Sequence, residues 1–234
     1  MNQGENPSTY VPLAGRDSAT ASKLQILATE HWSLLATRSL TYTESFGRVS
    51  MFLAILSGGV IALALVAQAD HFGPTFISIA IFVLAVVLFT GVATIGRLMQ
   101  LNGDDYRWVI AMNRIRHAYL EMHPELEPHF MSSPYDDLPG ALRTLGIDVT
   151  AARGLGSAMH VFQTLPGMLS IIVAAVAGAI SALAAIAFTA PPVVVTVAGA
   201  VMFVLAVVLL GTWGRRSVRQ LDPSLMPRFP SPKA

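Results

Sequence analysis

Residues 51–96, MFLAILSGGVIALALVAQA-DHFGP-TFISIAIFVLAVVLFTGVATIG, decide the fold, because two apolar runs flank a short turn there. Neither run, 51–69 or 75–96, contains a charged residue. About 20 helical residues cross a hydrocarbon core of ~30 Å, and in lipid a backbone must satisfy its own hydrogen bonds. The stretch therefore predicts a hairpin of two membrane-spanning helices, with Pro74 at the first position of the second helix.

A second pair of charge-free runs follows at 168–190 and 193–213, joined by a turn around two prolines. The chain as a whole is 53% hydrophobic and only 12% charged. Four runs of this length favour an all-α integral membrane protein with four transmembrane helices over a soluble bundle of buried helices. The partner expected from composition is the lipid bilayer. A net charge of +1 gives no case for nucleic-acid binding, and the absence of cysteine excludes disulfides.

The sequence between and around these runs divides the chain further. The expected segments are a disordered N-terminal tail (1–17), a cytoplasmic amphipathic helix (18–48), a first transmembrane hairpin (49–99), a cytoplasmic helical connection (100–167), a second transmembrane hairpin (168–213) and a cytoplasmic Pro/Arg-containing tail (214–234). The proline-rich end of that tail, PSLMPRFPSPKA, is typical of disorder.

Two of these segments leave local alternatives open. The amphipathic helix 18–48 either packs on other cytoplasmic helices or lies in the headgroup layer, with Trp32, Tyr42 and Phe46 as interfacial anchors. In the connection, the NGDD sequence at 102–105 favours a break in the helix. One short helix is expected at 140–145 and another at 151–167, and the rest is a Pro-rich loop.

The basic residues predict the topology. All 15 Lys and Arg lie in the N-terminal region, the 97–167 connection and the C-terminal tail, and neither hairpin turn contains one. Because positively charged loops stay on the cytoplasmic side, both termini and the connection are expected in the cytoplasm.

Three sets of residues are candidates for helix packing. Small residues four apart permit close helix approach and occur in both hairpins: Ala54, Gly58, Ala62 and Ala174, Gly178, Ala182. Apolar residues stepping by four and three form a cytoplasmic seam: Trp108, Met112, Ile115, Tyr119, Met122. The seam either packs on 18–48 of the same chain or binds a partner, and the small-residue faces allow a homo-oligomer.

Candidate chemistry is sparse, and no cofactor is expected. His117 and Glu121, one helical turn apart, can share a metal, with His123 and His129 as further weak candidates beside Glu125 and Glu127. The alternatives are a solvated acidic turn and an interaction surface formed by Arg114, Arg116 and Glu121. Asp136-Asp137 can hold Mg²⁺ or act as acid and base, although capping and turn formation explain the pair more simply. Span hydroxyls can line a pore or bond neighbouring helices: Ser57, Thr90, Thr94, Ser170, Ser181 and Thr196.

Two strings carry a family resemblance: ATEHWSLLATRSLTYTESFGRVSMFLAILSGGVIALALVAQ (28–68) and MNRIRHAYLEMHPELEPHF (112–130). They resemble a family of bacterial, mainly actinobacterial-type, multi-span integral membrane proteins without assigned function, which implies a bacterial cytoplasmic membrane and supplies no catalytic residues. In architecture, 18–123 is also similar to the two-helix SLATT effectors of bacterial defence systems, thought to form membrane pores, although the hairpin at 168–213 departs from that pattern.

These observations favour a non-enzymatic scaffold or regulatory membrane protein that associates through its cytoplasmic helices. An oligomeric pore or channel is the alternative. A membrane-bound metal-dependent enzyme is the third possibility, and it requires a metal at the string between His117 and His129.

Overall fold

The computed structural model describes residues 13–147, 164–219 and 225–232. All regular secondary structure within these ranges is helical. The elements are α1 (Leu13–Asp70), α2 (Pro74–Met122), the 3-10 helix η1 (Pro124–His129), α3 (Leu138–Thr144), α5 (Leu165–Ala187) and α6 (Pro192–Arg219). The all-α class is confirmed for this part of the chain. The short helix expected at 140–145 corresponds to α3, whereas the helix expected at 151–167 falls almost entirely outside the described residues.

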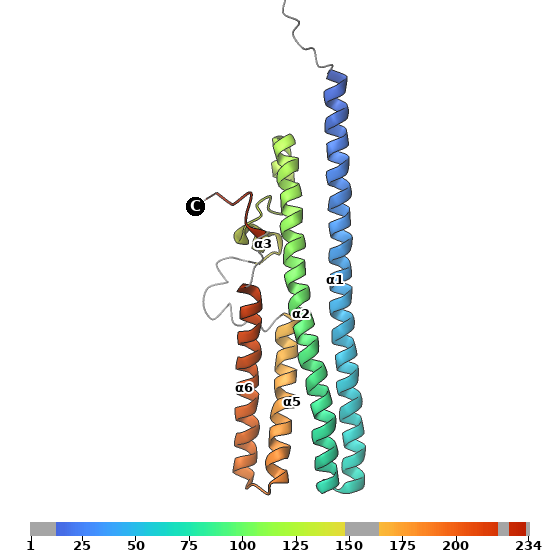
Figure 1. Cartoon of the computed structure of the whole chain (residues 1–234), viewed down its shortest axis with the longest axis vertical. Coiled ribbons are helices and arrows are strands. Elements are labelled where there is room, and N and C mark those ends of the chain that lie inside the picture. The colour runs from blue at the N-terminus through green and yellow to red at the C-terminus, as the bar shows by residue number, and fades with distance from the viewer. Residues whose placement is uncertain (1–12, 148–163, 220–224, 233–234) are drawn as a thin grey trace, which may run out of the picture.

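The first helix, α1, is continuous over 58 residues, without a break where the polar segment meets the apolar run. At 1.5 Å per residue it is about 87 Å long, nearly three times the hydrocarbon core. Its N-terminal half continues the axis of the span (Figure 1), which favours packing of 18–48 on the other helices over a position flat in a headgroup layer. Residues 13–17, expected in the tail, are helical as well. The polar half of α1 stays upright beside α2 because the two helices share an apolar cluster, in which Leu34 is buried and against which Leu27 packs.

The second helix, α2, runs for 49 residues through 102–105, so the expected break is wrong. The physical reason lies beside it. Asp105 forms an ion pair with Arg38 of α1 at 2.6 Å, and Asp104 pairs with Arg107 one turn along at 3.2 Å. These contacts hold the helix across Gly103, whose helical cost is only about 1 kcal/mol.

The second hairpin starts earlier than the apolar run suggests. The hydroxyl of Thr164 accepts the N–H of Gly167 at 3.2 Å, and Pro166 sits in the first turn of α5, where a proline needs no N–H partner. Pro166-Gly167 therefore lies in the first turn of the helix. The partner helix α6 continues past the apolar run to Arg219.

The four long helices pack side by side, with α2 between α1 and α5, and with α6 against α5 (Figure 1). Side chains from three of them meet in a core where each is at most 2% exposed: Phe52, Ile95, Leu98, Leu169 and Val173. Gly91 permits this approach, because a Cβ there would lie 2.5 Å from Cγ2 of Val173.

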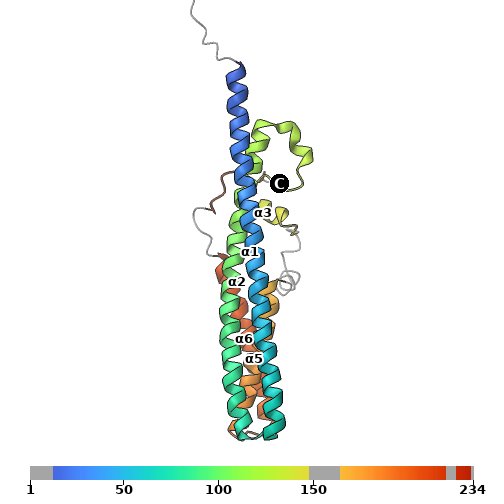
Figure 2. The ribbon, with the colours of Figure 1, turned by 90° about the vertical axis from the view of Figure 1, so that its right-hand side faces the viewer.

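Both hairpin turns lie at the same end of the bundle, and α3, η1 and the C-terminal residues lie toward the other end (Figures 1 and 2). In the first turn His71 and Phe72 take left-handed backbone angles, with φ of 50° and 61°. The carboxylate of Asp70 compensates by accepting the N–H of Phe76 at 2.7 Å. Four helices, α1, α2, α5 and α6, are long and apolar enough to cross a membrane, which indicates a multi-pass membrane protein.

Candidate functional site: a carboxylate clamp in the extramembrane layer

The extramembrane layer consists of 18–48 in α1, 97–122 in α2, η1, α3 and the C-terminal segment 225–232. Its apolar core is a second cluster, in which Met112 and Ile115 of the expected seam are buried and Trp108 and Tyr119 pack at the edge. Leu34 of α1 and Ala141 of α3 complete the cluster. The structure thus places the seam against its own chain, and Met122, which ends α2, is half-buried.

Two charged clusters join α1 and α2 within this layer. Arg38 donates to both oxygens of Asp105, from Nε at 2.6 Å and from Nη2 at 3.3 Å, and the hydroxyl of Tyr42 donates to the same carboxylate at 3.2 Å. Closer to the spans, Glu44 accepts from Arg97 at 2.9 and 3.0 Å and from Arg48 at 2.8 Å. Hydrogen bonds from Arg97 and then Arg48 lower the pKa of Glu44 to about 2.

The candidate site is a pair of aspartates, here called the carboxylate clamp, that binds the C-terminal segment. Asp136 is fully buried. Its Oδ1 accepts the backbone N–H of Phe229 at 2.8 Å, and its Oδ2 accepts that of Arg228 at 2.9 Å and Nε of Arg114 at 2.7 Å. The N–H of Asp136 donates in return to the carbonyl of Phe229 at 3.1 Å. Buried carboxylates normally need such partners.

The second aspartate, Asp137, has two tasks. Its Oδ1 caps α3 by accepting the N–H of Gly140 at 2.9 Å, which confirms the capping interpretation for this residue. The same oxygen accepts the hydroxyl of Ser231 at 2.8 Å, and Oδ2 accepts the N–H of Ser231 at 2.8 Å. Gly140 is needed here because a Cβ would collide with the carbonyl of Tyr135.

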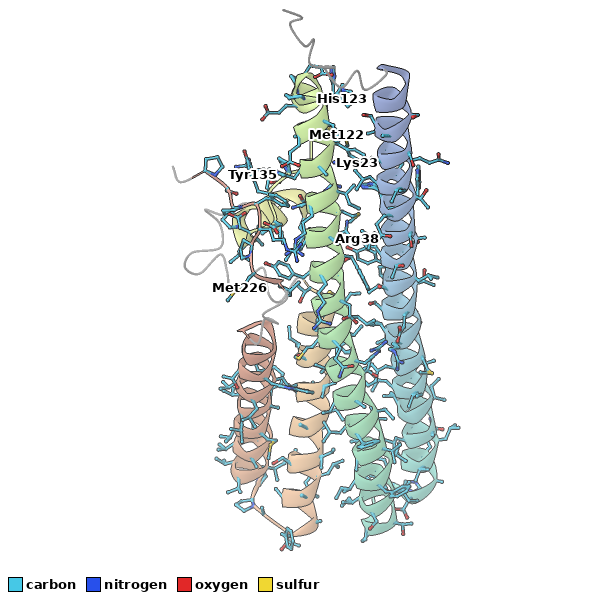
Figure 3. All side chains as sticks on the ribbon, turned by 45° about the horizontal axis from the view of Figure 1, so that its top comes forward. Lys23, Arg38, Met122, His123, Tyr135 and Met226 are labelled. Atoms are coloured by element: carbon cyan, nitrogen blue, oxygen red, sulfur yellow. The ribbon has the colours of Figure 1, made fainter. Side chains whose placement is uncertain are left out.

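The loop that carries the clamp is held from α2. Asn113, fully buried, donates to the carbonyl of Tyr135 at 2.7 Å and accepts from Arg116 at 2.7 Å and from the hydroxyl of Thr144 at 3.0 Å. Thr144 in turn accepts the N–H of Ser133 at 3.2 Å. Figure 3 shows both Tyr135 and Met226 on the side of α2 away from α1. Because these bonds do not involve the C-terminal segment, they fix the position of the clamp independently of it.

The pKa values of both aspartates are consistent with a clamp that stays ionised. Burial by itself raises the pKa of Asp136, but the N–H of Arg228, the Arg114 guanidinium and the N–H of Phe229 together lower it below its usual value. Burial likewise raises the pKa of Asp137, and hydrogen bonds from Ser231 and Gly140 outweigh it, so this pKa is also lowered.

The aromatic ring of Phe229 adds a side-chain contact. It stacks on the imidazole of His117 with a centroid distance of 3.9 Å and an interplanar angle of 23°. His117 Nε2 lies 3.6 Å from Oε1 of Glu121, which is long for a hydrogen bond. Beside this stack is a small cavity of about 210 Å³, lined by polar and apolar residues of the connection: His117, Leu120, Glu121, Pro124, Glu127, Pro134 and Tyr135.

The metal candidates do not assemble. His123 pairs with Glu125 at 3.0 Å, apart from the stacked His117, and His129 ends η1. Among residues 13–147, 164–219 and 225–232, no group of three or more His, Asp or Glu side chains can hold a metal ion.

The two small-residue faces have different surroundings. On α5, Ala174 and Gly178 are buried and Gly178 lies against α6, because a Cβ on Gly178 would lie 2.9 Å from the carbonyl of Gly199. On α1, Ala54, Gly58 and Ala62 are all exposed, and a Cβ on Gly58 would meet nothing within 4 Å. The small-residue face of α1 therefore packs on nothing within the described part of the chain.

The span hydroxyls mostly bond their own helices. Thr90, Thr94, Ser170 and Thr196 donate to carbonyls three or four residues earlier. Ser181 alone among the hydroxyls named here bonds across, to the carbonyl of Ala198 in α6 at 3.2 Å. Ser57 is exposed on α1.

Sequence reasoning missed Phe229 and Ser231 and did not link Arg114 to them, and the disorder expected at the C-terminus is wrong for 225–232. One sequence signal for the contact was available. Pro227 and Pro230 have no N–H, and the N–H groups of the residues between and after them are the ones that the two aspartates accept. Comparison with protein-family models, curated proteins and solved structures finds no match for the chain. The class that the fold defines is a multi-pass membrane protein, in which two aspartates bind the backbone of the chain's own C-terminal segment.

Proposed function

We propose that the chain is a non-enzymatic scaffold or regulatory protein of a bacterial cytoplasmic membrane. The observation that carries this proposal is the carboxylate clamp, a buried pair of aspartates whose oxygens accept backbone N–H groups of an extended segment. Carboxylates engaged in this way bind and orient a peptide, and they are not free to act as a general acid or base. The extramembrane layer thus offers a binding surface.

The cytoplasmic orientation is part of the same proposal. The basic residues belong to the two long helix extensions, the connection and the C-terminal region, and the two hairpin turns contain none. The resemblance of 28–68 and 112–130 to bacterial multi-span proteins supports the choice of membrane. A scaffold whose working surface lies in the cytoplasm agrees with both observations.

The test is the mass of the purified full chain in nanodiscs, together with ion flux from liposomes that contain it. We expect a monomer or small oligomer and liposomes that stay tight, because the span hydroxyls mostly bond their own helices. A closed ring with selective ion flux would overturn the scaffold and establish the pore, with the exposed Ala54–Gly58–Ala62 face as its packing contact.

A further inference from the structure

The C-terminal segment has a pattern of N–H donors that matches the clamp. Within 226–231 the prolines at 227 and 230 have no N–H, which leaves four backbone donors. Three of these four, at Arg228, Phe229 and Ser231, donate to Asp136 and Asp137 at 2.8–2.9 Å. A proline in place of Arg228, Phe229 or Ser231 would remove one of these bonds, so the match depends on where the prolines stand.

The site also binds one side chain and one carbonyl. The Phe229 ring stacks on His117, and Nη2 of Arg114 donates to the carbonyl of Met226 at 3.1 Å. The side chain of Met226 is 72% exposed and that of Arg228 is exposed as well. The contacts therefore favour an extended backbone with prolines at set positions and an aromatic ring. The exposed side chains of Met226 and Arg228 are not expected to affect binding.

The segment is held more loosely than the site that holds it. None of residues 225–232 is buried, and five of these eight are exposed. The receptor side, in contrast, contains Asn113, which is fully buried and bonds Tyr135 and Thr144 without involving the segment. Segments with few buried apolar contacts open at a small fraction of the global unfolding free energy. This difference in burial is the reason to expect the segment to open before α2, α3 and the loop between them.

We propose that the clamp is a peptide-recognition site for extended segments of the pattern Pro-x-aromatic-Pro-Ser, and that the chain's own C-terminal segment is an exchangeable occupant that blocks it. This inference rests on the proposed scaffold function and names its ligand class. The competing segment is the C-terminal segment of a second copy of the chain, because that is the sequence the site binds in the structure. Two prolines restrict the free peptide and so reduce the entropy lost on binding.

The experiment uses the full chain in nanodiscs, and the lack of cysteine allows site-specific labelling. Spin labels on R143C in α3 and P232C report the distance between the site and the segment. We expect one narrow distance distribution in the parent chain. Ser231→Pro, which removes the N–H and hydroxyl that Asp137 accepts, broadens it, whereas the matched variant Ser231→Ala keeps the N–H and stays narrow.

Free peptide LMPRFPSP is then titrated into the doubly labelled chain. A tethered segment has an effective concentration on the order of millimolar, so the peptide is expected to broaden the distribution in that range. N-methylation of the peptide at the residue corresponding to Phe229 abolishes competition. The same modification at the residue corresponding to Met226, whose N–H the aspartates do not accept, leaves competition intact.

Two results test the source of the competing segment and the site itself. Chains labelled singly, one at R143C and the other at P232C, are expected to give a narrow intermolecular distance, and its absence overturns a second copy as the competitor. A distribution that is broad in the parent chain, or one that neither Ser231→Pro nor the free peptide alters, overturns the exchangeable site. Neither result affects the mass and flux measurements, so the scaffold proposal stands or falls separately.

Discussion

At the scale of single residues, two glycines of α2 have opposite surroundings. A Cβ on Gly91 would lie 2.5 Å from Val173 and 2.9 Å from Phe52, at the point where α1, α2 and α5 meet, whereas one on Gly103 would meet nothing within 4 Å. We expect Gly91→Ala to lower the free energy of unfolding by about 1–3 kcal/mol through overpacking. Thermal unfolding of the helical circular dichroism signal in detergent measures this loss.

The matched variant is Gly103→Ala, in the same helix. Alanine removes backbone freedom from the unfolded chain without a steric cost, so this change is expected to stabilise by about 0.5–1 kcal/mol. Equal effects of both substitutions would contradict the packing described at Gly91.

The ion cluster at Glu44 gives a pH dependence of stability. Its pKa falls from 4.5 to about 2 through Arg97 and Arg48. A carboxyl whose folded pKa is lowered stabilises the fold above its unfolded pKa, and this contribution is lost as the pH falls through the folded value. Glu44→Gln should therefore lower the melting temperature at pH 7, and its difference from the parent chain should shrink between about pH 5 and pH 2.

The control for this prediction is Glu30→Gln, which removes the same charge from an exposed position on α1. It should leave the pH profile parallel to that of the parent chain. A Glu44→Gln profile that also stays parallel would mean that the contacts with Arg97 and Arg48 contribute nothing to folding.

Residue-level predictions from sequence succeeded where the cause is local. Asp137 precedes a Leu-Pro-Gly sequence and caps α3, as its position predicts. Its neighbour Asp136 has the same local context but binds Arg228 and Phe229, more than 90 residues away. No periodicity in the sequence encodes that contact, which is why the pair was not linked to the C-terminal segment.

At the scale of elements, the pairing of α5 and α6 depends on Gly178 and Gly199. A Cβ on Gly178 would lie 2.9 Å from the Gly199 carbonyl and 3.3 Å from Cβ of Phe203. Gly178→Val should force the helices apart and cost about 1–3 kcal/mol, visible as a lower melting temperature. Gly211→Val, where a Cβ meets nothing within 4 Å, is the control with the same side chain. A loss of the same size at Gly211 would show that valine itself, and not the crossing, is responsible.

The elements show how far the sequence reaches. Charge-free runs located all four spans, because lipid leaves a helix as the only way to satisfy their backbones. Their ends were less predictable. Thr164 and Pro166 start α5 three residues before the apolar run, and the pair between Arg38 and Asp105 carries α2 through Gly103. Caps and contacts between helices decide these boundaries, and only the caps are visible in sequence.

At the scale of the whole molecule, the long helices give the chain two unlike ends. The turn at 71–73 and the turn at 188–191 form one end, and α1 and α2 extend well beyond α5 and α6 at the other (Figures 1 and 2). The geometry places η1 and α3 of the connection opposite both turns (Figures 1 and 2). The basic residues, which the turns lack, are the reason for proposing that this end is cytoplasmic.

Cysteine labelling tests both statements in one experiment, because the parent chain has no cysteine. Thr75→Cys and Phe188→Cys place exposed thiols beside the two turns, and Met131→Cys places one at a position that is 99% exposed in the connection. A membrane-impermeant maleimide should label the first two in right-side-out spheroplasts and the third only in inverted vesicles. The reverse pattern would invert the proposed orientation and leave the fold intact. Labelling of Thr75→Cys and Phe188→Cys from opposite sides would contradict the arrangement of the hairpins, because both turns lie at the same end of the bundle (Figures 1 and 2).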